Sequence, residues 1–349
     1  MSLLDSSRTY SMDPYRRAFR IVGEFMDDLK RGLDSGRKVD LEIGSAEDIL
    51  LVGIGGSGII CDVVAQMISG RGARAKVLKG YSPCGSGWDL ALIVSHSGNT
   101  AEAIKHVLTL LEEKVPQVFI TSDGILARLA ERYGVSFAPV RGDVPPRYGF
   151  PSMLGAALGI LKKIGLMRVE VKYDEVKRFQ SRLKEDVPMK ENLAKKLASR
   201  IAGTFPIVYA YEEIRNAGYR LKCQLNENAK MYCGFAEIPE AFHNDLEALP
   251  RDCLIILPRS FREEPDLTEA IEAFTSLVGG EKVFSIRVDA RDELEELLKL
   301  FLFMDYTSLY VAVLRGSDPL ILPRLDEFKK RNKAYDEILR EAEKRLAGG

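Results

Sequence analysis

The chain has 349 residues, which is enough for about two α/β domains that each bury their own core. Its 50 lysine and arginine residues almost balance 51 acidic residues, so the formal net charge is -1. Such a chain has no overall field that would attract nucleic acid or an anionic membrane. We therefore expect neither partner, and any site for an anion must be local.

The N-terminus and the cysteines bear on localisation. Residues 1–19 contain neither the apolar core nor the cleavage site of a signal peptide, and no uninterrupted apolar run reaches the roughly 18 residues of a membrane span. The five cysteines form no CxxC pair, which favours reduced thiols over disulfides. The three histidines have no second ligand at zinc spacing, so we expect no metal site. These features predict a soluble, cytoplasmic protein.

Short apolar runs alternate with glycine- or hydroxyl-rich loops and with helical periodicity in the first half of the chain. Each run is short enough to be a strand buried on both faces, and the alternation is typical of parallel strands joined by helices. The sequence therefore predicts an α/β fold with a five-stranded parallel sheet. Its expected strands lie at residues 49–54, 75–78, 91–94, 117–120 and 136–138.

A charged stretch separates the two halves. It runs over residues 170–196 with almost no turn residues, which indicates a solvated helical connector. We therefore expect a first domain at 1–165, a helical connector at 166–194 and a second domain at 195–349. Residues 325–347 show apolar residues at helical spacing and should form one long amphipathic helix.

The second half repeats the order of the first. Strands are expected at 206–210, 253–260 and 282–288, each followed by a helix. The segment ALIVSHSGNTAEAIKHVL aligns with CLIILPRSFREEPDLTEAIEAF, which suggests an internal duplication. The alternative is that two βα units look alike in any such fold. Because the hydroxyl-rich loop occurs only in the first copy, we expect one phosphate site per chain.

The loop at residues 53–58, GIGGSG, lies between an expected strand and an expected helix. It matches the GxGxxG dinucleotide fingerprint, but a dinucleotide site also needs an acid at the end of the second strand, where this chain has Lys76 and Lys79. We therefore do not expect NAD. The loop offers unobstructed backbone, the Ser57 hydroxyl and a helix N-terminus for a polar ligand. The alternative is a simple tight turn.

The loop at residues 95–100, SHSGNT, gives a sharper prediction. It places Ser95, Ser97, Asn99 and Thr100 directly before a helix, whose N-terminus leaves about four free N–H groups and carries partial positive charge. Such a loop can bind a phosphate dianion without a lysine, whereas helix capping alone needs one hydroxyl. His96 is expected to point away from the loop. His106, in the following helix, is expected to lie on the surface.

Two residues in the second half could act as acid and base. Glu227 lies between two asparagines in an otherwise helical stretch, and His243 follows about one short connection later. By spacing alone, Glu227 would be a solvated helix carboxylate and His243 a residue at a helix start, so residue chemistry leaves the choice open.

Six segments change this interpretation when they are taken together. GIGGSG, SHSGNT, PPRYGFP, QLNENAK, EAFHND and PRLDEFKK, in this order, resemble the bifunctional phosphoglucose/phosphomannose isomerases of the phosphoglucose isomerase superfamily over nearly the whole chain. SHSGNT alone marks the wider class of sugar-isomerase (SIS) domains, which includes non-catalytic sensors. The resemblance implies two SIS domains, each a parallel sheet between helices, with a long C-terminal helix, in a homodimer.

The resemblance also implies which residues hold the substrate. Gly56 and Ser57 in GIGGSG, with Ser95, Ser97 and Thr100 in SHSGNT, would bind the phosphate and neighbouring sugar oxygens.

Four further residues would carry the reaction. Arg147 in PPRYGFP would steady the enediolate, and Glu227 in QLNENAK would be the base. His243 in EAFHND, contributed by the neighbouring subunit, would assist ring opening. Lys329 in PRLDEFKK would complete ring opening or contact the phosphate.

The implied activity interconverts glucose 6-phosphate and fructose 6-phosphate, and also mannose 6-phosphate and fructose 6-phosphate. Proton transfer through a cis-enediol needs a carboxylate base and a nearby cation but no redox cofactor, so we expect no cofactor. Leu322 stands where a related archaeal enzyme has a threonine that is proposed to help with mannose, so the glucose activity is expected first. The alternatives are a non-catalytic SIS sensor and a ketose phosphate aminating enzyme.

Overall fold

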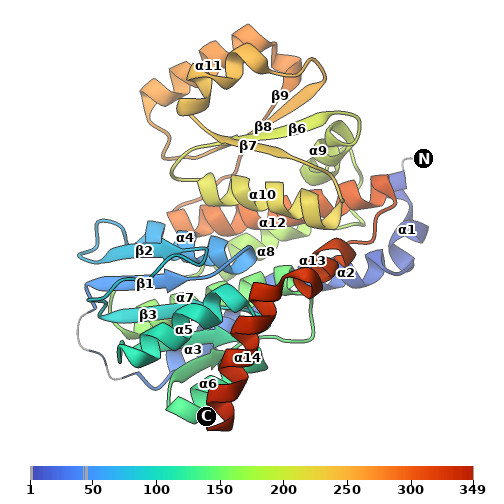
Figure 1. Ribbon diagram of the computed structural model, residues 1–349. Coiled ribbons are helices and arrows are strands. Elements are labelled where there is room, and N and C mark those ends of the chain that lie inside the picture. The colour runs from blue at the N-terminus through green and yellow to red at the C-terminus, as the bar shows by residue number, and fades with distance from the viewer. Residues whose placement is uncertain (1–2, 42, 44–45, 349) are drawn as a thin grey trace. The chain divides into compact units, whose positions relative to one another are not determined.

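A computed structural model describes residues 3–41, 43 and 46–348 (Figure 1). The chain folds into two compact units, each built around one sheet. We call them the five-stranded unit, which comprises Glu24–Glu170 and Leu322–Gly349, and the four-stranded unit, which comprises Met1–Gly23 and Val171–Ile321.

The five-stranded unit confirms the predicted parallel sheet. Its strands are β1 (Asp48–Val52), β2 (Arg74–Leu78), β3 (Leu90–Val94), β4 (Gln117–Thr121) and β5 (Ser136–Pro139), all paired in parallel in the order β2-β1-β3-β4-β5. Its helices are α3 (Phe25–Lys38), α4 (Gly56–Ile68), α5 (Ala101–Glu112), α6 (Gly124–Tyr133), the short 3-10 helix η2 (Pro146–Gly149), α7 (Phe150–Lys163), α13 (Pro323–Arg331) and α14 (Lys333–Ala347).

Helices α3 and α7 pack backbone to backbone through glycines. A Cβ atom at Gly32 would lie 1.9 Å from the Ser152 backbone oxygen, and one at Gly155 would lie 2.1 Å from the Leu29 backbone oxygen. Only glycine allows the two backbones to come this close, and the close contact holds α7 against α3. Because η2 leads directly into α7, the packing also holds the PPRYGFP turn in place.

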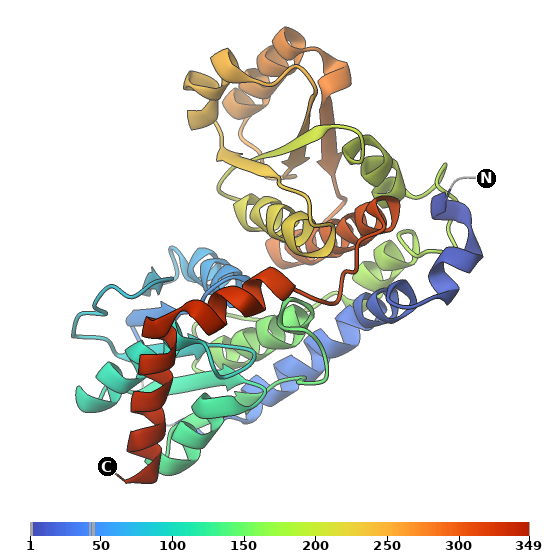
Figure 2. The same ribbon diagram turned by 45° about the vertical axis from the view of Figure 1, so that its right-hand side comes forward.

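The C-terminal segment belongs to the five-stranded unit. The expected long helix is present but is interrupted at Asn332, whose backbone (φ -83°, ψ 94°) is not helical and whose side chain caps α14 by accepting a hydrogen bond from the Tyr335 N–H. Helix α14 packs on α5 and α6 (Figures 1 and 2). Arg345 pairs there with Glu112, and Arg128 pairs with Glu343.

The four-stranded unit holds β6 (Phe205–Ala210), β7 (Gly234–Glu237), β8 (Cys253–Arg259) and β9 (Val283–Arg287), all parallel, in the order β7-β6-β8-β9. Three of these strands match the predicted ones. Strand β7 was not predicted, because this edge strand is short and only half-buried, and so carries no apolar run. The helices are α1 (Ser7–Ser11), α2 (Tyr15–Gly23), α8 (Tyr173–Ser181), α9 (Leu193–Ile201), α10 (Arg215–Asn228), α11 (Pro265–Val278) and α12 (Glu293–Arg315), with 3-10 turns at η1 (Leu3–Asp5), η3 (Glu240–His243), η4 (Asp245–Ala248) and η5 (Gly280–Lys282).

The two sheets share one topology. The order β7-β6-β8-β9 corresponds, strand for strand, to β2-β1-β3-β4 of the other sheet. The two segments aligned in the sequence form β3–α5 and β8–α11, at the same place in each order. The shared order supports the inferred internal duplication.

Helix α12 is the core helix of the four-stranded unit. Its length and hydropathy would allow it to cross a membrane, yet 94% of its apolar stretch is buried within the fold, as in the core helix of a soluble protein. Asp305 on α12 accepts two hydrogen bonds from Arg220 on α10, at 2.7 and 2.8 Å, and one from Gln224. This buried ion pair fixes α10, the helix that carries Glu227.

The boundaries of the two compact units differ from the expected domain boundaries near both ends of the chain. Helix α2 packs on α12, so the first 23 residues join the four-stranded unit, while residues from Leu322 join the five-stranded one. The expected connector contains α8, where Gln180 is buried and its amide donates to the Val22 and Gly23 oxygens.

Candidate functional site

The two glycine and hydroxyl loops lie side by side at one edge of the five-stranded sheet. Strands β1 and β3 are neighbours, with Val52 paired to Ile93, and the chain continues from β1 to β2 on one side but from β3 to β4 on the other. The strand order therefore reverses between β1 and β3. Ligands of open parallel sheets bind at such a switch point, beyond the carboxyl ends of the strands. Residues 53–58 and 95–100 leave the sheet there.

The SHSGNT loop presents hydroxyls at the start of α5. Ser95 is buried and shares a 2.8 Å hydrogen bond with the Thr100 hydroxyl, while the Ser97 hydroxyl accepts from the Asn99 N–H at 3.3 Å. Thr100 is the N-cap residue, but its side chain makes no capping hydrogen bond to α5. Since this cap does not use the hydroxyl, the arrangement suits an anion at the helix N-terminus.

The same loop is locked to the next one along the sheet. The Asn99 side-chain oxygen accepts from the Ile125 N–H at 2.9 Å, so this side chain supports α6. Gly98 has a φ of +66°, and a Cβ atom there would lie 1.8 Å from the Asp123 oxygen. Glycine is thus required at position 98 both for its backbone conformation and for space.

The GIGGSG loop is a tight turn into α4. Gly55 has a φ of +60° and caps the helix, and a Cβ atom at Gly53 would lie 2.8 Å from the Ser57 oxygen. Ser57 is buried in the first turn, with its hydroxyl 3.7 Å from the Met153 sulfur. Lys79, at the end of β2, forms an ion pair with Asp62 on α4. The position at which a dinucleotide site needs an acid is therefore occupied by a lysine.

Arg147 lies beside the GIGGSG loop. Its Cα atom is 4.0 Å from the position that a Cβ atom on Gly56 would take. The residue is 5% exposed, and its guanidinium lies 4.9 Å from the centre of the Tyr148 ring. Its place in η2 brings this residue from a distant part of the sequence to the GIGGSG loop.

The two histidines of this unit are both buried. The His96 ring points away from the loop, as predicted, and its Nε2 lies 2.7 Å from the Arg141 carbonyl oxygen. His106 was expected on the surface, and this is wrong. It is 2% exposed and bonds to the Gly80 oxygen at 2.8 Å, because its face of α5 packs against the loop that follows β2.

Lys329 reaches the same unit through the C-terminal segment. It lies on α13, half-buried, with its ammonium 6.0 Å from the centre of the Tyr335 ring. The Tyr335 hydroxyl donates to the Asn99 backbone oxygen. One tyrosine therefore connects the helix pair that carries Lys329 to the SHSGNT loop.

Glu227 and His243 belong to the four-stranded unit. Glu227 is half-buried in the last turn of α10. Its neighbours are structural, because the Asn226 side chain accepts from the Cys233 N–H and the Asn228 side chain donates to Ser308. Lys230 donates to the Glu227 backbone oxygen at 2.6 Å. His243 is exposed at the end of η3.

In the second copy, a carboxyl group of the chain itself contacts the loop that follows β8. Glu296, on the first turn of α12, accepts hydrogen bonds from the Ser260 hydroxyl at 2.9 Å and from the Phe261 N–H at 2.8 Å. Burial raises the pKa of this carboxyl, and those hydrogen bonds act in the opposite sense. The chain thus places one of its own carboxyl groups against this loop. Glu296 was not predicted from the sequence, where its only signal is an acid at a helix start.

The structure therefore divides the predicted site residues between the two units. Five residues expected to bind substrate and two expected to act in the reaction belong to the five-stranded unit: Gly56, Ser57, Ser95, Ser97, Thr100, Arg147 and Lys329. Glu227 and His243 belong to the four-stranded unit.

Comparison with known proteins supports the resemblance inferred from the motifs. Residues 190–331 match the family described as the bacterial phospho-glucose isomerase C-terminal SIS domain. A bifunctional phosphoglucose/phosphomannose isomerase of Pyrobaculum aerophilum is 28% identical over 284 residues, which are 81% of this chain and 86% of that protein. The chain is a homologue of the bifunctional phosphoglucose/phosphomannose isomerases. These homologues are isomerases, in agreement with the predicted enzyme class.

One further relative and one solved structure are also similar to this chain. A D-glucosamine-6-phosphate 4-epimerase of Sulfolobus acidocaldarius is 31% identical over 206 residues, which are 59% of this chain and 65% of that protein. The structure of the C-terminal domain of a glucosamine-fructose-6-phosphate aminotransferase of Francisella tularensis has a TM-score of 0.73, with 13% identity, and covers 88% of this chain and 99% of that one. Together with the SIS-domain family match, this likeness confirms the predicted fold of two SIS-type α/β units.

Proposed function

We propose that the protein is an aldose-ketose isomerase that interconverts glucose 6-phosphate and fructose 6-phosphate, and also mannose 6-phosphate and fructose 6-phosphate. The observation that carries the proposal is the SHSGNT loop at the sheet's switch point, where Ser95 and Thr100 lie at the N-terminus of α5. A phosphate bound there receives backbone N–H groups and hydroxyls without needing a lysine. Homology to phosphoglucose/phosphomannose isomerases supports the choice of reaction.

In this proposal the substrate phosphate is held by Gly56, Ser57, Ser95, Ser97 and Thr100. Gly56 has no side chain, so a ligand can approach its backbone closely. Contacts to a phosphate that takes no part in the reaction bind the substrate and the transition state about equally, so they set affinity and orientation.

The proton transfer is assigned to Glu227, with Arg147 as the stabilising cation. A carboxylate base removes the proton from C2 of the open-chain aldose, and a fixed guanidinium stabilises the enediolate oxygen that forms on C1. The base then returns the proton to C1, while the proton of the C2 hydroxyl passes to the oxygen on C1, which leaves a carbonyl at C2. Only protein side chains take part in these steps, so we propose that the reaction needs neither a metal nor a redox cofactor. Lys329 would assist ring opening or contact the phosphate.

His243 is proposed to act in the site of a neighbouring subunit, where it would assist ring opening. Its exposed position at the end of η3 leaves it available for such a role. The active form would then be a homodimer, and we place it in the cytoplasm.

A second candidate is epimerisation at C4 of glucosamine 6-phosphate. It is favoured by the relative of that name at 31% identity. A third is a sugar-phosphate sensor without turnover, since SIS domains as a class include such proteins.

A coupled assay on the purified protein distinguishes these candidates. Glucose 6-phosphate, mannose 6-phosphate and glucosamine 6-phosphate are supplied separately, each with and without EDTA, and thermal stability is measured with the same ligands. We expect fructose 6-phosphate from the first two substrates at rates that EDTA does not change. Stabilisation without turnover would identify a sensor, and turnover of glucosamine 6-phosphate alone would identify the epimerase. Loss of activity in EDTA would overturn the metal-free mechanism.

A further inference from the structure

His96 is the second residue of the SHSGNT loop, residues 95–100, which we call the phosphate loop after its proposed ligand. Its backbone and its ring are held by different parts of the five-stranded unit. The His96 backbone oxygen accepts from the Ser122 N–H at 2.9 Å and from the Ser122 hydroxyl at 2.6 Å. The path of the loop at this position is therefore fixed without help from the imidazole. His96 as a whole is only 5% exposed, so its ring is packed inside the unit.

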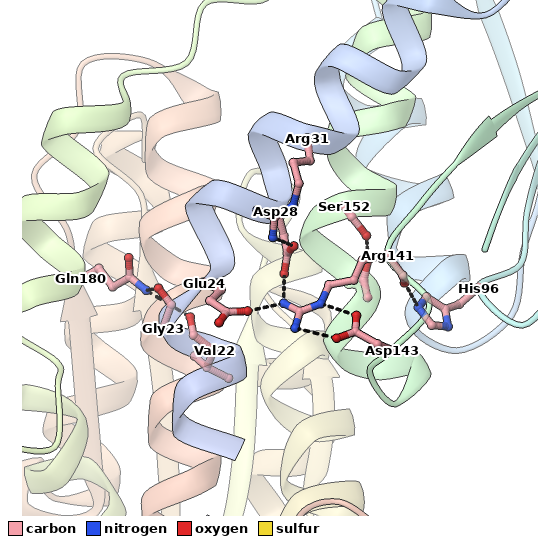
Figure 3. Close-up of polar contacts among 11 residues, drawn as sticks. Val22, Gly23, Glu24, Asp28, Arg31, His96, Arg141, Asp143, Ser152 and Gln180 are labelled. Atoms are coloured by element: carbon pink, nitrogen blue, oxygen red, sulfur yellow. Dashed lines mark hydrogen bonds and ion pairs between the residues drawn. The ribbon is translucent and has the colours of Figure 1, made fainter. Parts of the chain in front are cut away.

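The ring has one defined protonation form. Its Nε2 lies 2.7 Å from the Arg141 backbone oxygen, and a carbonyl can only accept, so Nε2 carries the hydrogen. Burial lowers the pKa of His96, which favours the neutral ring. Figure 3 shows this contact at one end of a chain of polar contacts.

Arg141 is itself firmly anchored. Its guanidinium pairs with Asp28 at 2.9 Å, with Asp143 at 2.7 Å and with Glu24, and the pairs with Asp28 and Glu24 join it to α3 and the residue before that helix (Figure 3). A guanidinium with three carboxylate partners has little freedom to move. The carbonyl that receives the His96 hydrogen bond therefore belongs to a fixed residue.

A second contact of the ring is with the turn that carries Arg147. A Cβ atom on Gly149 would lie 2.0 Å from His96 Cδ2 and 2.3 Å from Nε2, so the ring rests directly on the glycine backbone. Gly149 ends η2, two residues after Arg147, and its oxygen accepts from the Ser152 hydroxyl at 2.9 Å. The imidazole thus fills the space between the phosphate loop and this turn.

We propose that His96 is a positioning residue, whose ring sets the position of the Arg147 turn relative to the phosphate loop. The inference rests on the proposed function, because it gives Arg147 the task of stabilising the enediolate. Removing the ring leaves the phosphate contacts of Ser95 and Thr100 and the backbone bonds to Ser122 in place. It frees the turn to shift, and a misplacement of about 1 Å can lower the rate of an enzyme roughly a hundredfold.

The test is a set of four variants: His96→Ala, His96→Gln, Gly149→Ala and the double variant His96→Ala with Gly149→Ala. Steady-state kcat and KM are measured with glucose 6-phosphate. Two affinities are measured by titration: that for inorganic phosphate, and that for a five-carbon aldonate 5-phosphate. The carboxylate of this last compound carries negative charge where the enediolate would.

We expect His96→Ala to lower kcat at least about tenfold and to weaken the aldonate phosphate similarly, while the affinity for inorganic phosphate changes less than about twofold. His96→Gln should recover most of the loss, because its amide N–H can donate to the Arg141 oxygen. Gly149→Ala should lower kcat strongly in the wild-type background. It should add little to the loss in His96→Ala, where the ring that its methyl group would meet is absent.

Three results would overturn the inference. They are an unchanged kcat in His96→Ala, an equal loss of affinity for both ligands without rescue by glutamine, and full additivity of the two alanine substitutions. If the wild-type protein proves not to be an isomerase, the proposed function fails. Even then, the role of His96 can be decided from the affinities for the two ligands. The test is whether the changes in affinity caused by the two alanine substitutions add up in the double variant.

Discussion

The hydroxyl of Tyr335 donates a hydrogen bond to the backbone oxygen of Asn99. The first residue lies on α14 near the C-terminus and the second in the phosphate loop, 236 positions earlier in the chain. Because Lys329 lies 6.0 Å from the same tyrosine ring, this bond joins a proposed catalytic lysine to the proposed phosphate site.

Removing this hydroxyl should loosen the C-terminal helix pair. We expect Tyr335→Phe to lower the free energy of unfolding by about 1 kcal/mol, the net value of a typical hydrogen bond, and to reduce turnover several-fold. Denaturant unfolding and the isomerase assay measure the two effects. Tyr133→Phe, at an exposed position at the end of α6, is the matched control and should change neither. Equal behaviour of the two variants would show that the bond has no role.

Gly98 and Gly134 provide a matched pair for testing the phosphate loop. Both have a φ near +66°, but a Cβ atom at position 98 would meet the Asp123 oxygen, whereas position 134 is open. Gly134→Ala should cost only the backbone strain, about 1–2 kcal/mol. Gly98→Ala should cost more and should also abolish the binding of inorganic phosphate, measured by calorimetry. Normal phosphate binding by the Gly98 variant would argue against this loop as the site.

Glu263 should make the four-stranded unit sensitive to acid. Burial alone would raise the pKa of this carboxyl, but hydrogen bonds from Arg259, Thr268 and Tyr211 outweigh burial and lower the pKa to about 2, from an ordinary value of 4.5. The folded pKa is depressed, so the stabilisation is complete above about pH 4.5 and is lost as the pH falls toward 2.

The shift corresponds to stabilisation on the order of 3 kcal/mol at neutral pH, at about 1.4 kcal/mol per pKa unit. Urea unfolding of the wild type and of Glu263→Gln should differ most at pH 7, and the difference should shrink on acidification below about pH 4.5. Glu269→Gln, exposed on α11, should show no such difference at any pH. If the difference in unfolding free energy between wild type and Glu263→Gln stays constant with pH, the pKa shift of Glu263 does not contribute to stability.

Local patterns in the sequence predicted much of the fold and part of the site. The runs that became β1 and β3 are apolar enough to be recognised as buried strands, and the hydroxyls of Ser95 and Thr100 before a helix indicated an anion site directly. The predicted strands of both sheets are confirmed, and so is the orientation of the His96 ring.

Other features depend on contacts between distant segments and leave little local signal. Tyr335 meets Asn99, and Arg141 meets Asp28, only after the chain has folded. His106 has the spacing of a surface residue, yet it is buried because the loop after β2 lies over it. Glu296 accepts a hydrogen bond from the Ser260 hydroxyl, a contact that no short motif encodes.

The turnover of Glu227→Gln tests the central claim most directly. The substitution keeps the size of the side chain and removes its basicity, so we expect kcat for glucose 6-phosphate to fall by about 100-fold or more, while inorganic phosphate still binds with wild-type affinity. Glu272→Gln, exposed on α11 in the same unit, should retain full activity. A Glu227→Gln protein with near wild-type turnover would contradict the account.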